Sequence, residues 1–345
     1  MNIFLDDSAF KESLHPFTLT RHTADIRVGI LTIREKWERL TGLKIFTDNA
    51  YLNEESIVIP ANIIPAISTF EAIIQSAKQH SVIEATVEIK ILHHPWFIYQ
   101  YNDWAIRQDF ELITAGRKSQ VLSSGNQATA PENIFIEEGA EVEHCILNAS
   151  TGPIYIGKNA QLMEGCLVRG PFSLGEKALL KMGSRVYGAT TLGPYCVGGG
   201  EIKNSVMFAH SNKAHDGYLG DSVLGEWCNL GAGTSNSNVK NTGADVKYIT
   251  AQGNGLSAGN KAGLLMGDYS RAAINTSFTT GTIVGICCNI FGTPPGKFVN
   301  NFSWGEERYI FEKVISDIGN WKKMKGQDIE EVEIEMLRNL YNNNQ

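Results

Sequence analysis

The sequence predicts an α/β domain, then a solenoid built from short flat sides, then helices at the C-terminal end. The solenoid is indicated by apolar residues at six-residue steps and by Gly157, Gly175 and Gly193, which follow every third one. A six-residue step suits neither an α-helix nor a plain strand, whose periods are 3.6 and 2. A three-sided coil explains both signals, because each hexapeptide forms one side and turns one apolar residue inward. The pattern returns from Met266 to Ile290. The first apolar series is Ile156, Leu162, Val168, Leu174, Leu180, Val186 and Leu192.

Short strands and amphipathic helices alternate over roughly the first hundred residues. Ser68 and Glu71 have the spacing of a capping box, which marks the start of the second helix. Such alternation is typical of an α/β domain. In chain order, the expected elements are a strand at 2–5, a helix over 30–40 after Gly29, strands at 44–47 and 56–59, and a helix over 70–77.

The remaining segments complete the predicted domain organisation. Residues 117–133 are polar and lack periodicity, so we expect a connector between the α/β domain over 1–116 and the solenoid over 134–304. The repeat pattern is interrupted over 235–263, which predicts a loop that leaves the coil surface. Two helical stripes in 305–345 are expected to cover the open end of the solenoid, where backbone edges would otherwise be unpaired.

Composition excludes several classes of protein. The net charge of −7 argues against general nucleic-acid binding. No apolar run is long enough to predict a membrane span, and the N-terminus lacks the pattern of a secretory signal. The six cysteines match no zinc or redox motif, which favours free thiols in a reducing cytoplasm.

A long motif in the solenoid carries the chemical information. Residues 213–234 read KAHDGYLGDSVLGEWCNLGAGT, followed by SNSN, and SRVYGATTLGPYCVGGGEIK lies upstream. These stretches resemble the acetyltransferase domain of bacterial bifunctional enzymes that combine glucosamine-1-phosphate N-acetyltransferase and UDP-N-acetylglucosamine pyrophosphorylase activities. The resemblance implies a left-handed parallel β-helix, acetyl-CoA as co-substrate, and a homotrimer with active sites between subunits.

The resemblance also implies roles for six residues. His215 is the candidate general base, because an imidazole accepts a proton from the acceptor amine near neutral pH. Arg185 and Lys203 are the candidates for holding the sugar phosphate, one as a fork and one as a point charge. The candidates for hydrogen bonds to sugar hydroxyls or phosphate are Tyr218, Asn229 and Asn238. Alternatively, Asn229 is a corner residue of the coil and Asn238 stabilises the departing loop.

The N-terminal domain resembles sugar nucleotidyltransferase-like proteins in which such a domain precedes a hexapeptide acetyltransferase domain. The stretches PFTLTRHTADIRVGILTIREKW and NDWAIRQDF carry this resemblance, although the domain is reduced and lacks a G-x-G-T-R loop. It implies attack of a sugar 1-phosphate on a nucleoside triphosphate, with Mg²⁺ neutralising the phosphates. Arg27 precedes a helix N-terminus, which suits an anion. The phosphate-binding candidates are Arg21, Arg27 and Lys36, and the alternative for Lys36 is a solvated side chain. The metal candidates, which form no recognisable motif, are Asp6, Asp7 and Asp103.

The sequence therefore predicts a transferase of amino-sugar nucleotide biosynthesis. The solenoid is expected to acetylate an amino-sugar 1-phosphate. The N-terminal domain is expected to transfer a nucleotidyl group; alternatively, it is a relic of such a domain that is used for assembly. The first alternative is a nucleotidyltransferase whose solenoid only trimerises or senses a ligand. The second alternative is a non-catalytic assembly protein, although such a solenoid has no reason to keep this set of polar residues.

Overall fold

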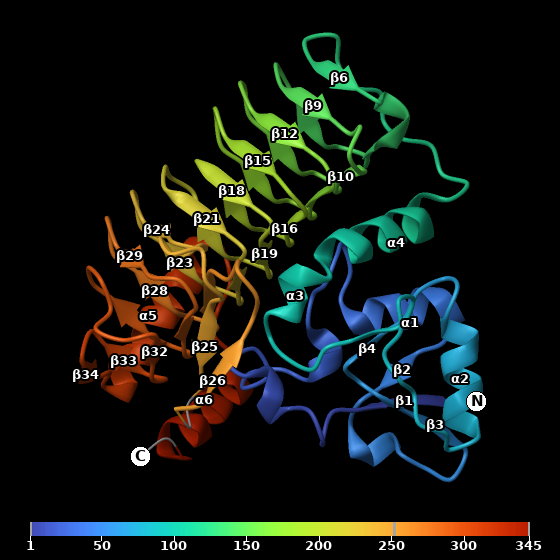
Figure 1. The fold of residues 1–345 in the computed structure, drawn as a ribbon, viewed down its shortest axis with the longest axis horizontal. Helices are drawn as coiled ribbons and strands as arrows, with labels where there is room; N and C mark the ends of the chain where they lie inside the picture. Colours follow the sequence, from blue (N-terminus) through green and yellow to red (C-terminus); the bar gives the residue numbers. More distant parts are fainter. Residues whose placement is uncertain (1, 251–252, 344–345) are drawn as a thin grey trace.

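The computed structural model describes residues 2–250 and 253–343 and contains a small α/β domain, a long parallel β-solenoid and two C-terminal helices (Figure 1). The solenoid predicted from the hexapeptide pattern is confirmed, because successive coils pair in parallel and in register. The coils contribute short strands to three long sheets, which form the three sides of a prism.

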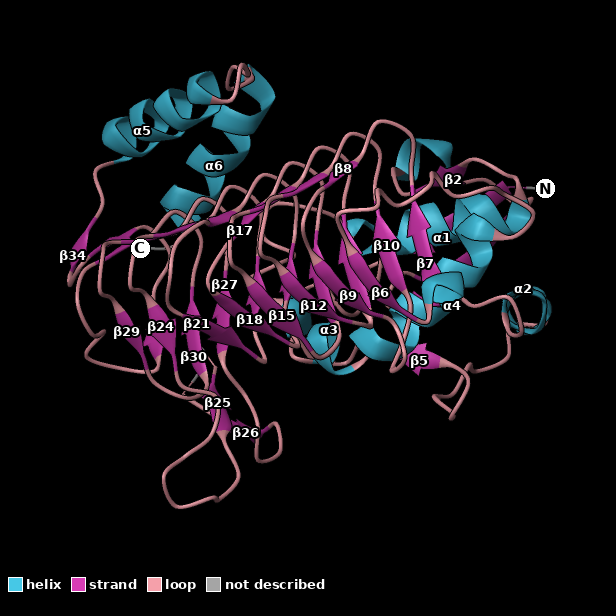
Figure 2. Ribbon diagram, turned by 90° about the horizontal axis from the view of Figure 1, so that it is seen from above, coloured by secondary structure: helices cyan, strands magenta, loops and turns pink. Residues whose placement is uncertain are grey.

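The three sheets run along the length of the solenoid (Figure 2). The nine-stranded sheet contains β7 (Ile134–Ile136), β10 (Ile154–Ile156), β13 (Phe172–Leu174), β16 (Thr190–Leu192), β19 (Val206–Met207), β22 (Val223–Leu224), β27 (Leu264–Met266), β30 (Thr282–Val284) and β32 (Phe298–Val299). The ten-stranded sheet contains β8 (Glu141–Val142), β11 (Gln161–Leu162), β14 (Leu179–Leu180), β17 (Val197–Gly198), β20 (Asn212–Lys213), β23 (Asn229–Leu230), β28 (Arg271–Ala272), β31 (Asn289–Ile290), β33 (Ser303–Trp304) and β34 (Glu307–Arg308). The six-stranded sheet contains β6 (Gln127–Thr129), β9 (Ile146–Asn148), β12 (Leu167–Arg169), β15 (Arg185–Tyr187), β18 (Glu201–Lys203) and β21 (Tyr218–Gly220). Beyond β21 lies the pair β24 (Ser235–Asn236) and β29 (Ser277–Phe278), and the interruption of the coil contains the hairpin β25 (Lys247–Ile249) and β26 (Gly255–Ser257).

Glycines allow successive coils to approach closely. A Cβ atom on Gly157 would lie 2.7 Å from the main-chain carbon of Gly175, and one on Gly175 would lie 2.6 Å from that of Gly193. A Cβ on Gly193 would lie 2.7 Å from the carbonyl oxygen of Phe208 in the next coil. The glycine period of the sequence therefore reflects backbone contact between stacked coils.

Gly193→Ala is accordingly expected to lower the free energy of unfolding by about 1–3 kcal/mol, because the backbone it meets is fixed by the coil above. Gly296→Ala is a matched control, since its added methyl group would meet only the carbonyl oxygen of Phe298, at 4.0 Å. Urea unfolding of both variants measures the difference. Equal midpoints for the two variants would contradict this account of the glycine period.

The first coil begins earlier than predicted. Residues 127–129 form β6, which pairs with β9 through Gln127 and Ile146, so part of the predicted connector 117–133 belongs to the solenoid. The pattern was invisible in the sequence because all three residues of β6 are exposed and no large apolar side chain lies among them. The polar connector is therefore shorter than its composition indicates.

The N-terminal domain is α/β, as predicted. Its parallel sheet has the order β2-β1-β3, with β1 at its centre. A capping box at Thr32 and Glu35 starts the first helix, whereas the box predicted at Ser68 is wrong, because α2 begins after Thr69 without a side-chain cap. The strands are β1 (Asn2–Asp6), β2 (Ile45–Phe46), β3 (Ser56–Pro60), β4 (Ile63–Ile64) and β5 (Lys90–Ile91), and the helices are α1 (Ile33–Thr41), α2 (Phe70–Lys78), α3 (Phe97–Gln100) and α4 (Asn102–Thr114). Short 3₁₀ helices occur at Glu12–Leu14, Thr23–Asp25, Asn49–Tyr51 and Pro131–Asn133.

The α/β domain covers the outer face of the nine-stranded sheet (Figure 1). One apolar cluster joins its core to outward residues of β19, β22, β27 and β30. Phe17 packs on Phe208 with ring centroids 5.4 Å apart, and Trp96 stacks on Tyr248 at 5.2 Å. Polar contacts reinforce this packing, since the side-chain amide of Asn102 donates to the carbonyl oxygen of Ala189 at 2.8 Å. The domain is therefore fixed on the solenoid through a shared core.

The helices α5 (Phe311–Met324) and α6 (Glu331–Asn343) lie along the side of the last coils (Figure 2). The prediction that they cover the open end is wrong, because their apolar residues pack against a row of side chains at one corner of the coils. These corner residues have positive φ angles, which turn their side chains outward into an apolar strip. They include Trp227, Tyr269, Cys287 and Phe302.

The same corner predicts a loss of stability in acid. The His210 ring is stacked between Tyr195 and Trp227, and burial, with smaller contributions from Lys325 and Lys322, lowers its pKa to about 4. Because the folded-state pKa lies below the unfolded one, stability is lost as the pH falls below about 6.5. Allowing for partial exposure, we expect a loss on the order of 1–2 kcal/mol by pH 4. His210→Phe keeps the stack and should remove this part of the pH dependence in urea unfolding; an unchanged acid limb would refute it.

Candidate active site

Three of the predicted substrate-binding residues lie on one side of the solenoid. Arg185, Lys203 and Tyr218 come from the neighbouring strands β15, β18 and β21 of the six-stranded sheet. The register pairs Arg185 with Glu201 and Glu201 with Tyr218, while Lys203 pairs with Tyr187. Between these positions the residues are buried, so the paired side chains face outward in rows. The solenoid thus presents cationic and phenolic groups together on its surface.

His215 lies beside this row. It occupies the corner between β20 and β21, three residues before Tyr218, and it is exposed. Its carbonyl oxygen accepts a hydrogen bond of 2.5 Å from the buried ammonium of Lys213. A Cβ on Gly200, the residue before β18, would lie 2.8 Å from the same carbonyl oxygen, which places the His215 corner next to the start of this strand. The imidazole is therefore available to a molecule bound on this side.

The two predicted phosphate binders carry unneutralised charge. Within residues 2–250 and 253–343, neither Arg185 nor Lys203 forms an ion pair with a carboxylate. The Lys203 ammonium lies 5.6 Å from the centre of the Tyr187 ring, and the Tyr187 hydroxyl donates to Glu201 at 2.6 Å. An anion between the two cations would gain charge-assisted hydrogen bonds from both.

Tyr218 and Asn238 belong to one hydrogen-bond network. The side-chain amide of Asn238 donates to the Tyr218 hydroxyl at 3.1 Å and also to the buried carboxylate of Asp221, which accepts from Asn204 at 2.6 Å. A Cβ on Gly220 would lie 2.2 Å from the Tyr218 hydroxyl, so a larger residue there would displace the Tyr218 ring from this position. Burial, with help from the Asp221 charge, raises the pKa of Tyr218 and keeps its hydroxyl protonated. Asn238 is thereby tied to Tyr218 and Asp221 of the preceding coil.

Asn229 lies on another side of the prism. It is in β23 of the ten-stranded sheet, in register with Asn212 and Arg271. This side faces α5, since the Arg271 guanidinium lies 5.3 Å from the Trp321 ring centre. Within one chain, Asn229 is therefore not on the side that carries Arg185, Lys203 and Tyr218, because eleven residues after Tyr218 the coil has turned through two corners.

The predicted phosphate binders of the N-terminal domain are engaged inside the protein. Both terminal nitrogens of Arg21 donate hydrogen bonds to the buried carboxylate of Asp268, Nη1 at a distance of 3.2 Å. The guanidinium lies 5.0 Å from the centre of the Phe208 ring. Arg27 donates to the carbonyl oxygen of Ile30 and lies 3.6 Å from Glu35. Arg21 therefore fastens the N-terminal domain to the solenoid, and Arg27 closes its own loop.

Lys36 is likewise not solvated. Its ammonium bonds both oxygens of Asp109, and each side chain is at most 2% exposed. The same carboxylate accepts the main-chain N–H groups of Ile30 and Leu31, at 2.7 and 3.0 Å. The alternative of a solvated residue and the role in phosphate binding are both contradicted, because Lys36 is the counterion of a buried carboxylate.

The structure gathers no carboxylates for a metal. Asp6 accepts hydrogen bonds from Ser8, Asp7 lies 3.3 Å from the His22 imidazole, and Asp103 pairs with Arg107 at 2.7 Å. Among the described residues, no group of three or more histidine, cysteine or acidic side chains is arranged to hold a metal ion. The three candidates therefore do not fit a Mg²⁺ site.

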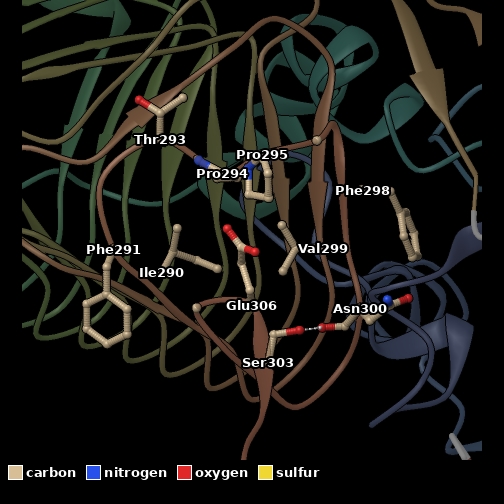
Figure 3. A pocket seen from close by; sticks show the side chains of 12 residues that line it. Ile290, Phe291, Thr293, Pro294, Pro295, Phe298, Val299, Asn300, Ser303 and Glu306 are labelled. Atoms are coloured by element: carbon tan, nitrogen blue, oxygen red, sulfur yellow. Dashed lines mark hydrogen bonds between the residues drawn. The ribbon is translucent and has the colours of Figure 1, made fainter.

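The larger hollows lie away from these residues. The cavity in Figure 3 has a volume of about 480 Å³ and is lined by the last coil, from Ile290 to Glu306. Another, of about 530 Å³, lies between the loop after β1 and β30, near His15 and Ile283. Neither contains His215 or its neighbours, which stand on an open face. None of the described helices is long and apolar enough to cross a membrane.

Three charged residues that contact the candidate site residues were not predicted from the sequence: Lys213, Glu201 and Asp221. Lys213 occupies an inward position of the coil, where the pattern calls for an apolar residue, and this mismatch was the available signal. Glu201 and Asp221 gave no comparable signal, because acidic residues at outward and corner positions are ordinary in a solenoid.

Comparison with known proteins agrees with the two-part organisation. Residues 2–84 match the family model described as sugar nucleotidyl transferase. A bifunctional sugar-1-phosphate nucleotidylyltransferase/acetyltransferase from Sulfurisphaera tokodaii is 29% identical over 251 residues, which are 68% of this chain and 53% of that protein. The bifunctional protein GlmU of Methanococcus maripaludis is 25% identical over 278 residues, covering 76% of this chain and 59% of the relative.

The chain spans about half the length of these curated relatives. Among solved structures, an Arabidopsis UDP-N-acetylglucosamine acyltransferase superposes with a TM-score of 0.32 at 15% identity, over 58% of this chain and 77% of that one. Residues 2–84 thus match the sugar nucleotidyl transferase family model, and the chain is similar to bifunctional nucleotidylyltransferase/acetyltransferases over about two thirds to three quarters of its length.

Proposed function

We propose that the solenoid transfers an acetyl group from acetyl-CoA to the amine of an amino-sugar 1-phosphate such as glucosamine-1-phosphate. The observation that carries this proposal is the grouping of two unpaired cations, Arg185 and Lys203, with the exposed His215 and with Tyr218 on one side of the coil. The names of the relatives, which include acetyltransferase activity, support the same reaction.

In this reaction the phosphate lies between Arg185 and Lys203, and the amine approaches His215. The imidazole removes a proton as the amine nitrogen attacks the carbonyl carbon of the thioester. The carbon–sulfur bond then breaks, the acetamide forms, and the proton passes from the imidazolium to the leaving thiolate. Tyr218 donates a hydrogen bond to a sugar hydroxyl, a role that the protonated phenol retains at neutral pH. Asn238, whose two amide hydrogens are held by Tyr218 and Asp221, accepts a hydrogen bond from the sugar through its side-chain oxygen.

We also propose a homotrimer. The N-terminal domain covers the nine-stranded sheet, and α5 with α6 lies along the corner next to the ten-stranded sheet. The six-stranded sheet is uncovered, and its outward Ile146 and Leu167 are 45% and 46% exposed. A second copy on this side would bury them and add a wall to the open active site, and Asn229 of that copy is a candidate contributor. Sedimentation analysis tests this assembly.

Nucleotidyl transfer by the N-terminal domain is the second candidate function, supported by the family match over residues 2–84. The binding groups must differ from Arg21 and Lys36, which are held in internal ion pairs. Mg²⁺ would then be held largely by the triphosphate itself. Pyrophosphate release from UTP and N-acetylglucosamine-1-phosphate tests this function, and its absence with every nucleoside triphosphate would leave the domain as a structural cover.

The compartment we propose is the reducing cytoplasm. All six cysteines are free and buried in the structure. Burial raises the pKa of several of these thiols, among them Cys196 to about 12 and Cys288 to about 11, which suppresses the reactive thiolate form. Free thiols of this kind persist where glutathione keeps them reduced.

The experiment for the main proposal measures free thiol released from acetyl-CoA in the presence of glucosamine-1-phosphate. Glucosamine without phosphate is the matched substrate control, and we expect it to react far more slowly because Arg185 and Lys203 have nothing to hold. Equal release of thiol from acetyl-CoA with both sugars, or no release with either sugar, would overturn the proposal. The second outcome would favour a solenoid that only assembles or senses a ligand.

A further inference from the structure

A lysine occupies an inward position of the coil beside the candidate active site. The inward row of the ten-stranded sheet is otherwise apolar or glycine, and Lys213 pairs there with Gly198 of the preceding coil. Its side chain is only 2% exposed. Burying an ammonium group is costly unless it is hydrogen-bonded, so its contacts require a reason. The row reads Val142, Leu162, Leu180, Gly198, Lys213, Leu230, Ala272 and Ile290.

The Lys213 side chain leads from the interior to the corner that carries His215. Its ammonium donates to the carbonyl oxygen of Gly199 at 2.8 Å and to that of His215 at 2.5 Å. One nitrogen therefore ties two successive coils together at this corner. No other inward residue of this row reaches the active-site surface in this way within the described chain.

The glycines of the preceding coil make room for this arrangement. A Cβ on Gly200 would lie 2.8 Å from the His215 carbonyl oxygen and 3.0 Å from the Lys213 ammonium. A Cβ on Gly199 would lie 2.4 Å from the carbonyl oxygen of Ala214. The corner is therefore pressed directly against backbone, and the ammonium fills the space that remains.

We propose that Lys213 is a positioning residue that holds the His215 main chain against the preceding coil, and so sets the imidazole beside the phosphate-binding cations. This inference rests on the proposed acetyl transfer, because it assigns a task to His215. A catalytic base loses much of its effect when it is displaced by about 1 Å, so a group that fixes its main chain has a large influence on rate.

The charge of Lys213 gives this corner a pH dependence. Burial lowers its pKa to about 8, Asp216 and Glu201 oppose that shift, and Arg185 reinforces it. The ammonium is charged at neutral pH and loses its proton in mild alkali, which weakens both carbonyl contacts. Acetyl transfer should therefore decline with an apparent pKa near 8 on the basic side.

The lowered pKa of Lys213 also distinguishes a positioning role from a role in stabilising the fold. Because the folded-state pKa of Lys213 lies below its unfolded value, the buried charge destabilises the folded protein at neutral pH. Lys213→Met fills the interior position without a charge, so we expect a protein at least as stable as the wild type. A lysine that served stability alone would give the opposite result.

The experiment compares wild type, Lys213→Met and the exposed control Lys158→Met. For Lys213→Met we expect kcat to fall on the order of 10- to 100-fold, with KM for glucosamine-1-phosphate little changed and the basic decline near pH 8 lost. Hydrogen exchange at residues 214–217 should become faster, while the thermal midpoint is not lowered. Lys158→Met should resemble wild type in every measurement.

Full kcat with an unchanged basic decline in Lys213→Met would overturn the inference, even if acetyl transfer itself is confirmed. If the wild type shows no acetyl transfer, the proposed function fails separately, and hydrogen exchange still decides whether Lys213 holds the corner. Unchanged protection of residues 214–217 in Lys213→Met would then overturn the inference as well.

Discussion

His215→Ala is expected to lower kcat for acetyl transfer by about 100- to 10,000-fold, the usual contribution of a general base. The imidazole is exposed and, among the described residues, its side chain makes no hydrogen bond or ion pair, so its removal should leave stability unchanged. Thiol release at saturating substrate measures the rate, and circular dichroism with thermal unfolding verifies the fold.

His93→Ala is the matched control, because His93 is also exposed but lies in the N-terminal domain next to Phe97. It should retain wild-type activity. Loss of activity in both variants would point to a general effect of histidine replacement. Unchanged kcat in His215→Ala would remove this residue from the mechanism, whatever its effect on KM.

The second large effect concerns the buried pair of Lys36 and Asp109. Lys36→Met should lower the free energy of unfolding by about 3–5 kcal/mol, because it leaves an uncompensated carboxylate in the core. Burial raises the pKa of Asp109, so the variant should recover part of its stability in acid, where the carboxylate is protonated. Urea unfolding at pH 8 and pH 5, followed by fluorescence, measures this penalty.

The double variant Lys36→Met with Asp109→Asn is the informative control. It removes both charges and keeps an oxygen for the main-chain N–H groups of Ile30 and Leu31, so we expect it to be clearly more stable than Lys36→Met alone. A single variant as stable as the wild type would show that the pair does not hold the loop after Arg27. It would also restore Lys36 as a candidate for phosphate binding.

The parts of the structure set by short-range pattern were predictable. The six-residue step fixed the inward residues such as Val168 and Leu174, and the glycines at 157, 175 and 193 proved to be points of backbone contact. Because stacked coils are locally determined, Tyr218, three residues after His215, also lies in the same sheet as Arg185.

Long-range pairing was not predictable from one sequence. Arg21 and Asp268 are 247 residues apart, and nothing near Arg21 indicates that its partner lies in a corner of the solenoid. The sequence allowed Lys36 to be a solvated helix residue, because its partner Asp109 is distant in the chain and lies in α4. Asn229 lies on a different side of the prism from Tyr218 because of the turning of the coil, which depends on how many residues each corner takes.

A crystal structure of the protein with glucosamine-1-phosphate and acetyl-CoA tests the central claim most directly. We predict the phosphate between Arg185 and Lys203 and the amine nitrogen within hydrogen-bond reach of the His215 imidazole. A sugar phosphate bound elsewhere, or one whose amine faces away from that ring in every subunit, would contradict the account.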